Sequence, residues 1–138
     1  MSFAPVKNLS DKSVQSVRFL FSHGALFNLS AGILLITASL NASVARLIGL
    51  KVVTDLWAAQ FVGLTVLVFG WIYWTIGRNP VKNRDMIQFG LIGKSLTVLV
   101  IGGHFLLGNL TWQAPALASF DAMYTVLFWR ALSRLKHG

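Results

Sequence analysis

The sequence has no cysteine and no glutamate, and only 12% of its residues are charged. Without cysteine there is no disulfide, no thiolate metal site and no thiol nucleophile. Without glutamate, the Glu-x-x-His pattern of helical metal sites is missing as well. A soluble domain usually carries about 25% charged residues, so a chain this poor in charge would have difficulty covering its surface in water.

Apolar residues, in contrast, make up 55% of the 138 residues and fall into long uncharged segments. A hydrocarbon core about 30 Å thick needs roughly 20 apolar residues in a helix. Four transmembrane helices are predicted, at residues 17–40, 55–77, 86–109 and 116–132. The last has the weakest pattern because it contains Asp121, but Pro115 suits a helix start. The predicted fold class is all-α, a polytopic membrane four-helix bundle in a single domain.

The net charge of +8 comes from residues at the ends of these segments. Three basic residues lie before or at the start of the first helix, three lie in the 78–85 turn and three lie at or after the end of the last helix. This gives nine on one side of the membrane: Lys7, Lys12, Arg18, Arg78, Lys82, Arg84, Arg130, Arg134 and Lys136. The other side has Arg46 and Lys51. Because basic residues favour the cytoplasmic side, both termini are predicted to be inside. No dense basic run or basic helix face indicates nucleic-acid binding.

The third helix carries a stripe of residues at alternating spacings of three and four, which places them on one helix face. The stripe consists of Ile87, Gly90, Lys94, Thr97, Ile101, His104 and Gly108. Polar groups facing lipid are costly, so the stripe is predicted to face the bundle interior or a wet cavity. Two interpretations stay open for it: inter-helix packing, or a ligand-binding site.

Lys94 also has two interpretations. Its long stem could carry the ammonium back to the cytoplasmic interface, or the ammonium could bind an anion, a carbonyl or a carboxylate inside the membrane. His104 and Asp121 are predicted to lie at similar depth on neighbouring antiparallel helices. They form either a functional pair or an ordinary polar contact. With Asp55 and Gln60 at the start of the second helix, they define a candidate outer pocket.

A haem held by two histidines of one chain does not fit this topology. Such a haem needs both histidines at one depth on opposed helices. His23 is predicted near the inner side and His104 near the outer side, so they should lie roughly 15 Å apart along the membrane normal. A haem with a single axial histidine, or one shared between subunits, stays open, and a quinone or a lipid is also a candidate ligand.

The second half of the chain has a recognisable order of segments. GRNPVKNRD leads into FGLIGKSLTVLV, and a short turn leads into FDAMYTVLFWRAL. Over residues 70–133 this resembles the small bacterial four-helix membrane proteins grouped around the DoxX-like families, with Gly93, Lys94 and Asp121 at the matching positions. The resemblance implies a bacterial inner membrane location and a role in quinone-linked respiration or as a subunit of a larger complex.

The sequence contains no recognisable catalytic constellation, and its loops are short. The leading prediction is a non-catalytic subunit that packs with other membrane subunits or with itself. One alternative is the binding of a quinone or another lipophilic molecule around Lys94, His104 and Asp121, with Thr97 and Gln60 nearby. Another is an oligomeric transporter or channel lined by the stripe of the third helix.

Overall fold

A computed structural model of the chain describes residues 11–50 and 55–137, and within these ranges it contains helices and no strand. Lys7 and Lys51 lie outside the described residues. The helices are α1 (Asp11–Leu40), α2 (Ala42–Leu47), α3 (Leu56–Arg78), α4 (Met86–Leu106) and α5 (Gln113–His137). Three of them, α1, α3 and α4, are long and apolar enough to cross a membrane. The all-α membrane class is thus supported by three helices, and α5 is not among them.

The helix ends differ from the predicted ones by up to two turns, and local chemistry explains two of the differences. Helix α4 ends at Leu106 because Gly108 adopts a left-handed backbone, with φ of +73°. There the amide of Gly108 donates to the carbonyl of Phe105 and the amide of Asn109 donates to that of His104, which is the Schellman arrangement. Helix α5 begins at Gln113, so Pro115 lies in its first turn, where a missing amide costs nothing.

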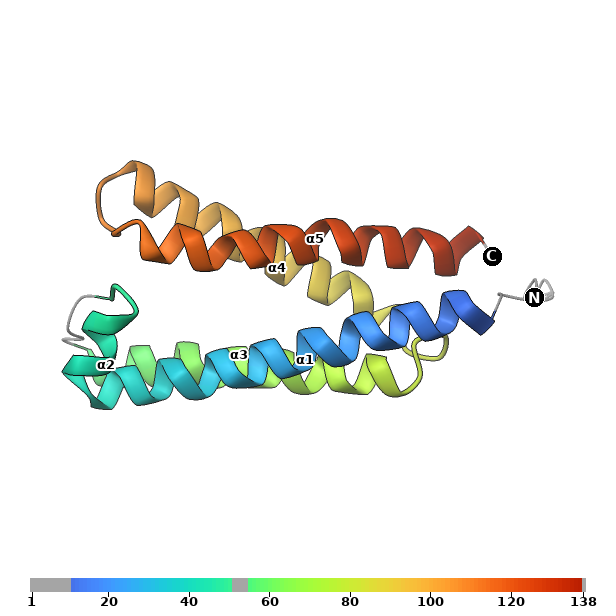
Figure 1. The fold of residues 1–138 in the computed structure, drawn as a ribbon, viewed down its shortest axis with the longest axis horizontal. Helices are drawn as coiled ribbons and strands as arrows, with labels where there is room; N and C mark the ends of the chain where they lie inside the picture. The colour runs from blue at the N-terminus through green and yellow to red at the C-terminus, as the bar shows by residue number, and fades with distance from the viewer. Residues whose placement is uncertain (1–10, 51–54, 138) are drawn as a thin grey trace.

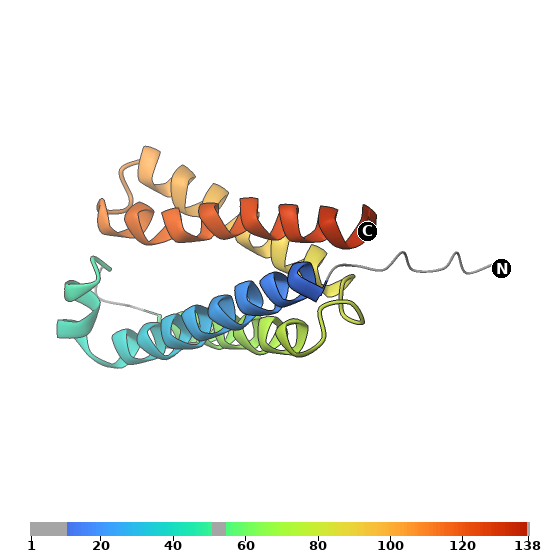
Figure 2. The ribbon, with the colours of Figure 1, turned by 45° about the vertical axis from the view of Figure 1, so that its right-hand side comes forward.

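The four long helices form two antiparallel pairs, α1 with α3 and α4 with α5 (Figures 1 and 2). The pairs meet at one end of the molecule, where α1 starts, α3 turns into α4 and α5 finishes. We call this the basic end, since Arg18, Arg78 and Arg134 lie there. The two helix pairs separate towards the opposite end of the molecule, which we call the α2 end. There the hydroxyl of Thr111 donates to the carbonyl of Gly49 at 2.8 Å and links the two pairs.

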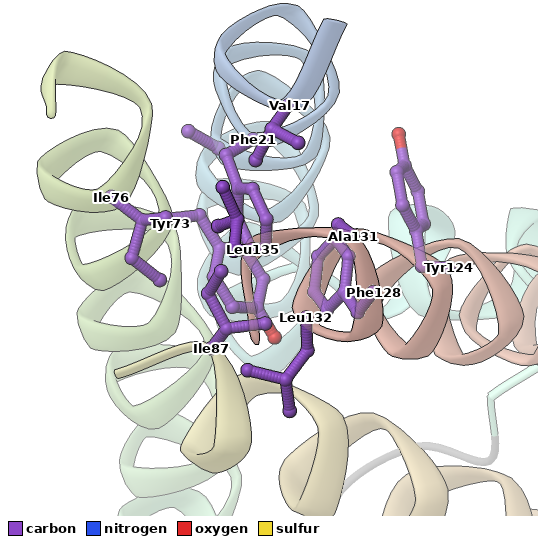
Figure 3. Close-up of a cluster of buried hydrophobic side chains, with 11 residues drawn as sticks. Val17, Phe21, Tyr73, Ile76, Ile87, Tyr124, Phe128, Ala131, Leu132 and Leu135 are labelled. Carbon is purple, nitrogen blue, oxygen red and sulfur yellow. The ribbon is translucent and has the colours of Figure 1, made fainter. Parts of the chain in front are cut away.

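The apolar core lies near the basic end and draws on all four long helices (Figure 3). Phe21 and Phe128 stack with ring centroids 4.3 Å apart, and the ring of Tyr73 meets Phe128 edge-on at 5.0 Å. Gly90 makes room for these rings, because a Cβ there would lie 2.7 Å from a carbon of Tyr73. The core residues are Val17, Phe21, Ala25, Tyr73, Ile76, Ile87, Tyr124, Phe128, Ala131, Leu132 and Leu135.

Glycines bring α1 and α3 into close contact along their length. A Cβ at Gly63 would lie 2.6 Å from a side-chain carbon of Ile36, and one at Gly70 would lie 2.9 Å from Leu29. On the α1 side, a Cβ at Gly32 would lie 2.7 Å from Leu67. Small residues let membrane helices approach closely and gain van der Waals contact without a hydrophobic driving force. This contact makes α1 and α3 a tightly joined pair.

Candidate functional site

Lys94 is buried in the middle of α4, with only 5% of its surface exposed. Its Nζ donates a hydrogen bond to Oδ1 of Asn28 on α1 at 2.7 Å and forms an ion pair with Asp121 on α5. A charged group inside a membrane is costly unless it is paired, and here one carboxylate and one amide oxygen receive it. The site therefore connects three helices that are distant in sequence.

Three aromatic rings complete the surroundings of the ammonium group. Nζ lies 5.3 Å from the ring centroids of Phe27 and Tyr124 and 5.6 Å from that of Tyr73. A cation at this distance from ring faces is stabilised by their quadrupoles, by about 2 kcal/mol when water is excluded. Because Tyr73 belongs to α3, the Lys94 site includes residues from all four long helices.

The arrangement decides between the two interpretations of Lys94. The ammonium is held by Asn28 and Asp121 within the bundle, which agrees with the second interpretation, a carboxylate partner. An ammonium has three donors. Two are taken by Asn28 and Asp121, and aromatic faces surround the group. Chemically this is a charge-neutral, hydrogen-bonded connection between helices. It offers neither a free nucleophile nor a free base.

The structure does not bring His104 and Asp121 together. His104 is exposed near the end of α4 and its Nδ1 lies 3.2 Å from Nδ2 of Asn109. Asp121 lies about 12 Å along the axis from the start of α5, which is deep enough to reach Lys94 instead. The prediction that His104 and Asp121 lie at equal depth is wrong. It placed the end of the third helix at Asn109 and the start of the fourth after Pro115. Because α4 ends earlier and α5 begins earlier, His104 moves outward and Asp121 moves inward.

The other candidate site residues have separate surroundings. Asp55 is exposed and caps α3, where Oδ1 accepts from the amide of Ala58 at 3.2 Å. Gln60 is half-buried, and the exposed Thr97 donates to the carbonyl of Gly93. Asp55, His104 and Asp121 thus each have a different partner and do not assemble the outer pocket that the sequence predicted. Their part in ligand binding stays a prediction.

The stripe on α4 is buried only in its first half. Ile87, Gly90 and Lys94 are buried, whereas Thr97 and His104 are exposed in the single chain. The change occurs where the two helix pairs separate (Figure 1). The prediction that the stripe faces the bundle interior therefore holds only towards the basic end.

Sequence reasoning missed several residues of the site. No spacing in the sequence linked Asn28, Phe27, Tyr73 or Tyr124 to Lys94, although all four contact it in the structure. A further polar pair joins α1 and α5, where Nδ1 of His23 lies 2.5 Å from the hydroxyl of Tyr124. The one available signal was that Asn28 is a strongly polar side chain in an apolar segment, which in a membrane requires a partner.

No group of three or more histidine, cysteine or acidic side chains that could hold a metal ion occurs in residues 11–50 and 55–137.

None of three comparisons with known proteins gives a match to this chain: neither a scan against protein-family models, nor a search of curated proteins, nor a search of solved structures. The resemblance to DoxX-like proteins therefore remains a prediction, and the interpretation of the site rests on its own geometry.

Proposed function

We propose that this chain is an integral membrane protein with four crossings and both termini in the cytoplasm, which acts as a non-catalytic subunit packed against another membrane protein or a second copy of itself. Three apolar helices support the membrane location. The arginines of the described residues gather mainly at the basic end, and Arg46 lies in α2, which supports the orientation. A bacterial inner membrane remains the expected location, as the DoxX-like resemblance implies.

The fourth crossing is supported by the Lys94 site. Asp121 is the only acidic residue of α5, and its charge is neutralised by Lys94 inside the bundle. The 25 residues of α5 span about 37 Å, and the 21 residues of α4 beside it span about 31 Å. Since α4 is long enough to cross the bilayer, α5, which is longer and runs antiparallel against it, crosses too.

The observation that carries the packing role is the half-covered stripe of α4. Thr97 and His104 continue the face of Ile87, Gly90 and Lys94, but no helix of the described chain covers them. A polar stripe left against lipid costs free energy. A helix of another subunit on this face would remove that cost. A ligand site at Lys94 has less support, because Asn28 and Asp121 already occupy its ammonium.

The test is native mass spectrometry of the full chain extracted gently from its own membrane. We expect a mass above the 15.2 kDa of one chain, either a multiple of it or a complex with a second protein. A bulky side chain on the stripe, Thr97→Trp, should release the partner. The matched control is Leu99→Trp, which places the same bulk on the opposite, exposed face of α4. A wild-type chain that is always monomeric, or equal release by both variants, would contradict the proposal.

A further inference from the structure

A hollow of about 410 Å³ lies between α1 and α5 near the basic end. Its walls are mostly apolar and include Phe19 and Leu20 of α1 and Met123 and Leu127 of α5. Val17 and Ala131, which belong to the core cluster, also line it. The hollow is open at the surface, so it forms an apolar groove between two helices rather than an enclosed cavity.

Two arginines one helical turn apart, Arg130 and Arg134, border the groove towards the end of α5. The sequence has only four carboxylate side chains. Two of them form ion pairs, Asp121 with Lys94 and Asp85 with Arg84. Within residues 11–50 and 55–137, no carboxylate side chain lies within ion-pair distance of Arg130 or Arg134. The groove therefore has a positive charge that the described protein does not balance.

A polar pair lies in the part of the groove that is further from the basic end than Arg130 and Arg134. The imidazole of His23 and the hydroxyl of Tyr124 both border it and are hydrogen-bonded to each other. Figure 3 shows the Tyr124 hydroxyl turned away from the core. Tyr124 and Arg130 are separated by about 9 Å along the helix axis. The groove thus has cationic groups near the basic end, hydrogen-bonding groups one or two helical turns further from that end, and apolar walls throughout.

We propose that this groove binds one anionic phospholipid. The phosphate pairs with Arg130 and Arg134, the ester region reaches His23 and Tyr124, and an acyl chain lies along the apolar walls. Basic pockets between transmembrane helices bind anionic lipid headgroups in this way. Two arginines without a carboxylate favour a headgroup with net negative charge over a zwitterionic one, whose ammonium would find no acidic partner among the groove residues. The inference is independent of any partner on α4 and requires only that the basic end lies at a bilayer surface.

The first experiment measures binding to the full chain in mild detergent after its native lipids have been removed. Phosphatidylglycerol, phosphatidylcholine and inorganic phosphate are added separately, and bound molecules and the melting temperature are followed by native mass spectrometry and thermal denaturation. We expect one phosphatidylglycerol per chain and a rise in melting temperature. Equal binding of phosphatidylcholine would overturn the charge argument, and an equal effect of inorganic phosphate would overturn the lipid assignment.

The arginines are tested by a double variant, Arg130→Gln with Arg134→Gln. A basic residue near a charged membrane surface contributes about 1 kcal/mol, so losing two should weaken phosphatidylglycerol binding roughly tenfold or more. The matched control, Lys82→Gln with Arg84→Gln, removes the same charge from the 78–85 turn at the same end of the molecule. Equal weakening in both double variants would mean diffuse attraction rather than a site, and would overturn the proposal.

The apolar walls are tested by filling the groove. Leu127→Trp places an indole among the lining residues, whereas Val126→Trp places it on the neighbouring exposed face of α5. We expect Leu127→Trp to abolish lipid binding and Val126→Trp to leave it unchanged. Melting temperatures without lipid show whether each variant is folded. A folded Leu127→Trp protein that binds phosphatidylglycerol like the wild type would overturn the proposed position of the acyl chain.

Discussion

The basic end and the α2 end of the molecule both carry large apolar residues but pack in different ways. At the basic end, Phe21 and Phe128 are fully buried in a core shared by four helices. At the α2 end, Leu106 and Trp112 are 86% and 69% exposed, and the helix pairs are joined by the hydrogen bond from Thr111 to Gly49. In lipid, apolar residues gain little from being hidden. Close packing therefore occurs where shapes and polar groups match, and the Lys94 site lies where the close contact between the two helix pairs ends.

The largest expected effect on stability comes from breaking the ion pair between Lys94 and Asp121. Asp121→Leu would leave the Lys94 ammonium buried with only Asn28 as partner, and breaking a buried ion pair on one side costs about 3 to 5 kcal/mol. We expect a large fall in melting temperature in detergent. The double variant with Lys94→Met should recover most of the stability, because no unpaired charge remains. A single variant as stable as the wild type would show that the ion pair does not join the helices.

Within the core at the basic end, Phe128→Ala should cost about 2 kcal/mol. The lost transfer energy is small in lipid, so the cost comes mainly from the cavity and lost ring contacts with Phe21 and Tyr73. Leu106→Ala at the α2 end removes an exposed side chain and should change the free energy of unfolding by less than about 0.5 kcal/mol. Denaturation by increasing SDS would measure both, and equal effects would remove the distinction between the two ends.

The glycines sharpen the comparison between packed and open helix faces. Gly63→Val should cost about 1 to 3 kcal/mol, because the new atoms would overlap Ile36 and separate α1 from α3. Gly102→Val is the matched control, since a Cβ at Gly102 meets nothing within 4 Å. Thermal denaturation of the two variants should differ clearly. A stable Gly63→Val protein would mean that α1 and α3 can separate without loss.

The smallest expected effect concerns the polar pair between α1 and α5. Tyr124→Phe keeps the ring beside Lys94 and removes only the hydroxyl bonded to His23. Hydrogen bonds between membrane helices contribute on average about 0.6 kcal/mol, so the loss should be of that size. It can be measured against His23→Ala in a double-mutant cycle. A coupling near zero would show that this hydrogen bond adds nothing to the packing of the basic end.

The sequence predicted the helical membrane class and the positions of α1, α3 and α4 from the length of their apolar segments. It could not predict the partners of Lys94, because a shift of one turn moves a side chain by 5.4 Å along the axis. The helix ends depended on local details such as the left-handed backbone of Gly108. These details changed the relative depths of His104 and Asp121 and therefore the pairing.

The aromatic rings around the Lys94 ammonium could not be predicted from the sequence pattern either. Tyr73 and Tyr124 are on different helices, and nothing in the spacing of either helix indicates that both rings face the same ammonium. Their convergence follows from the crossing of the two helix pairs at the basic end (Figure 2). The polar character of Asn28 and Lys94 could be read from the sequence, whereas their contact depends on how α1 and α4 are packed.

The Lys94–Asp121 pair also has a consequence for how the chain enters the membrane during synthesis. A lysine or an aspartate at the centre of a helix that inserts alone costs about 2.5 to 3.5 kcal/mol. Helix α5 carries Asp121 and is not apolar enough to be identified as a span by composition, but α4 precedes it with the opposite charge. We expect α4 to be retained beside the translocon until α5 arrives, so that the two helices enter the lipid together with the charges of Lys94 and Asp121 already paired.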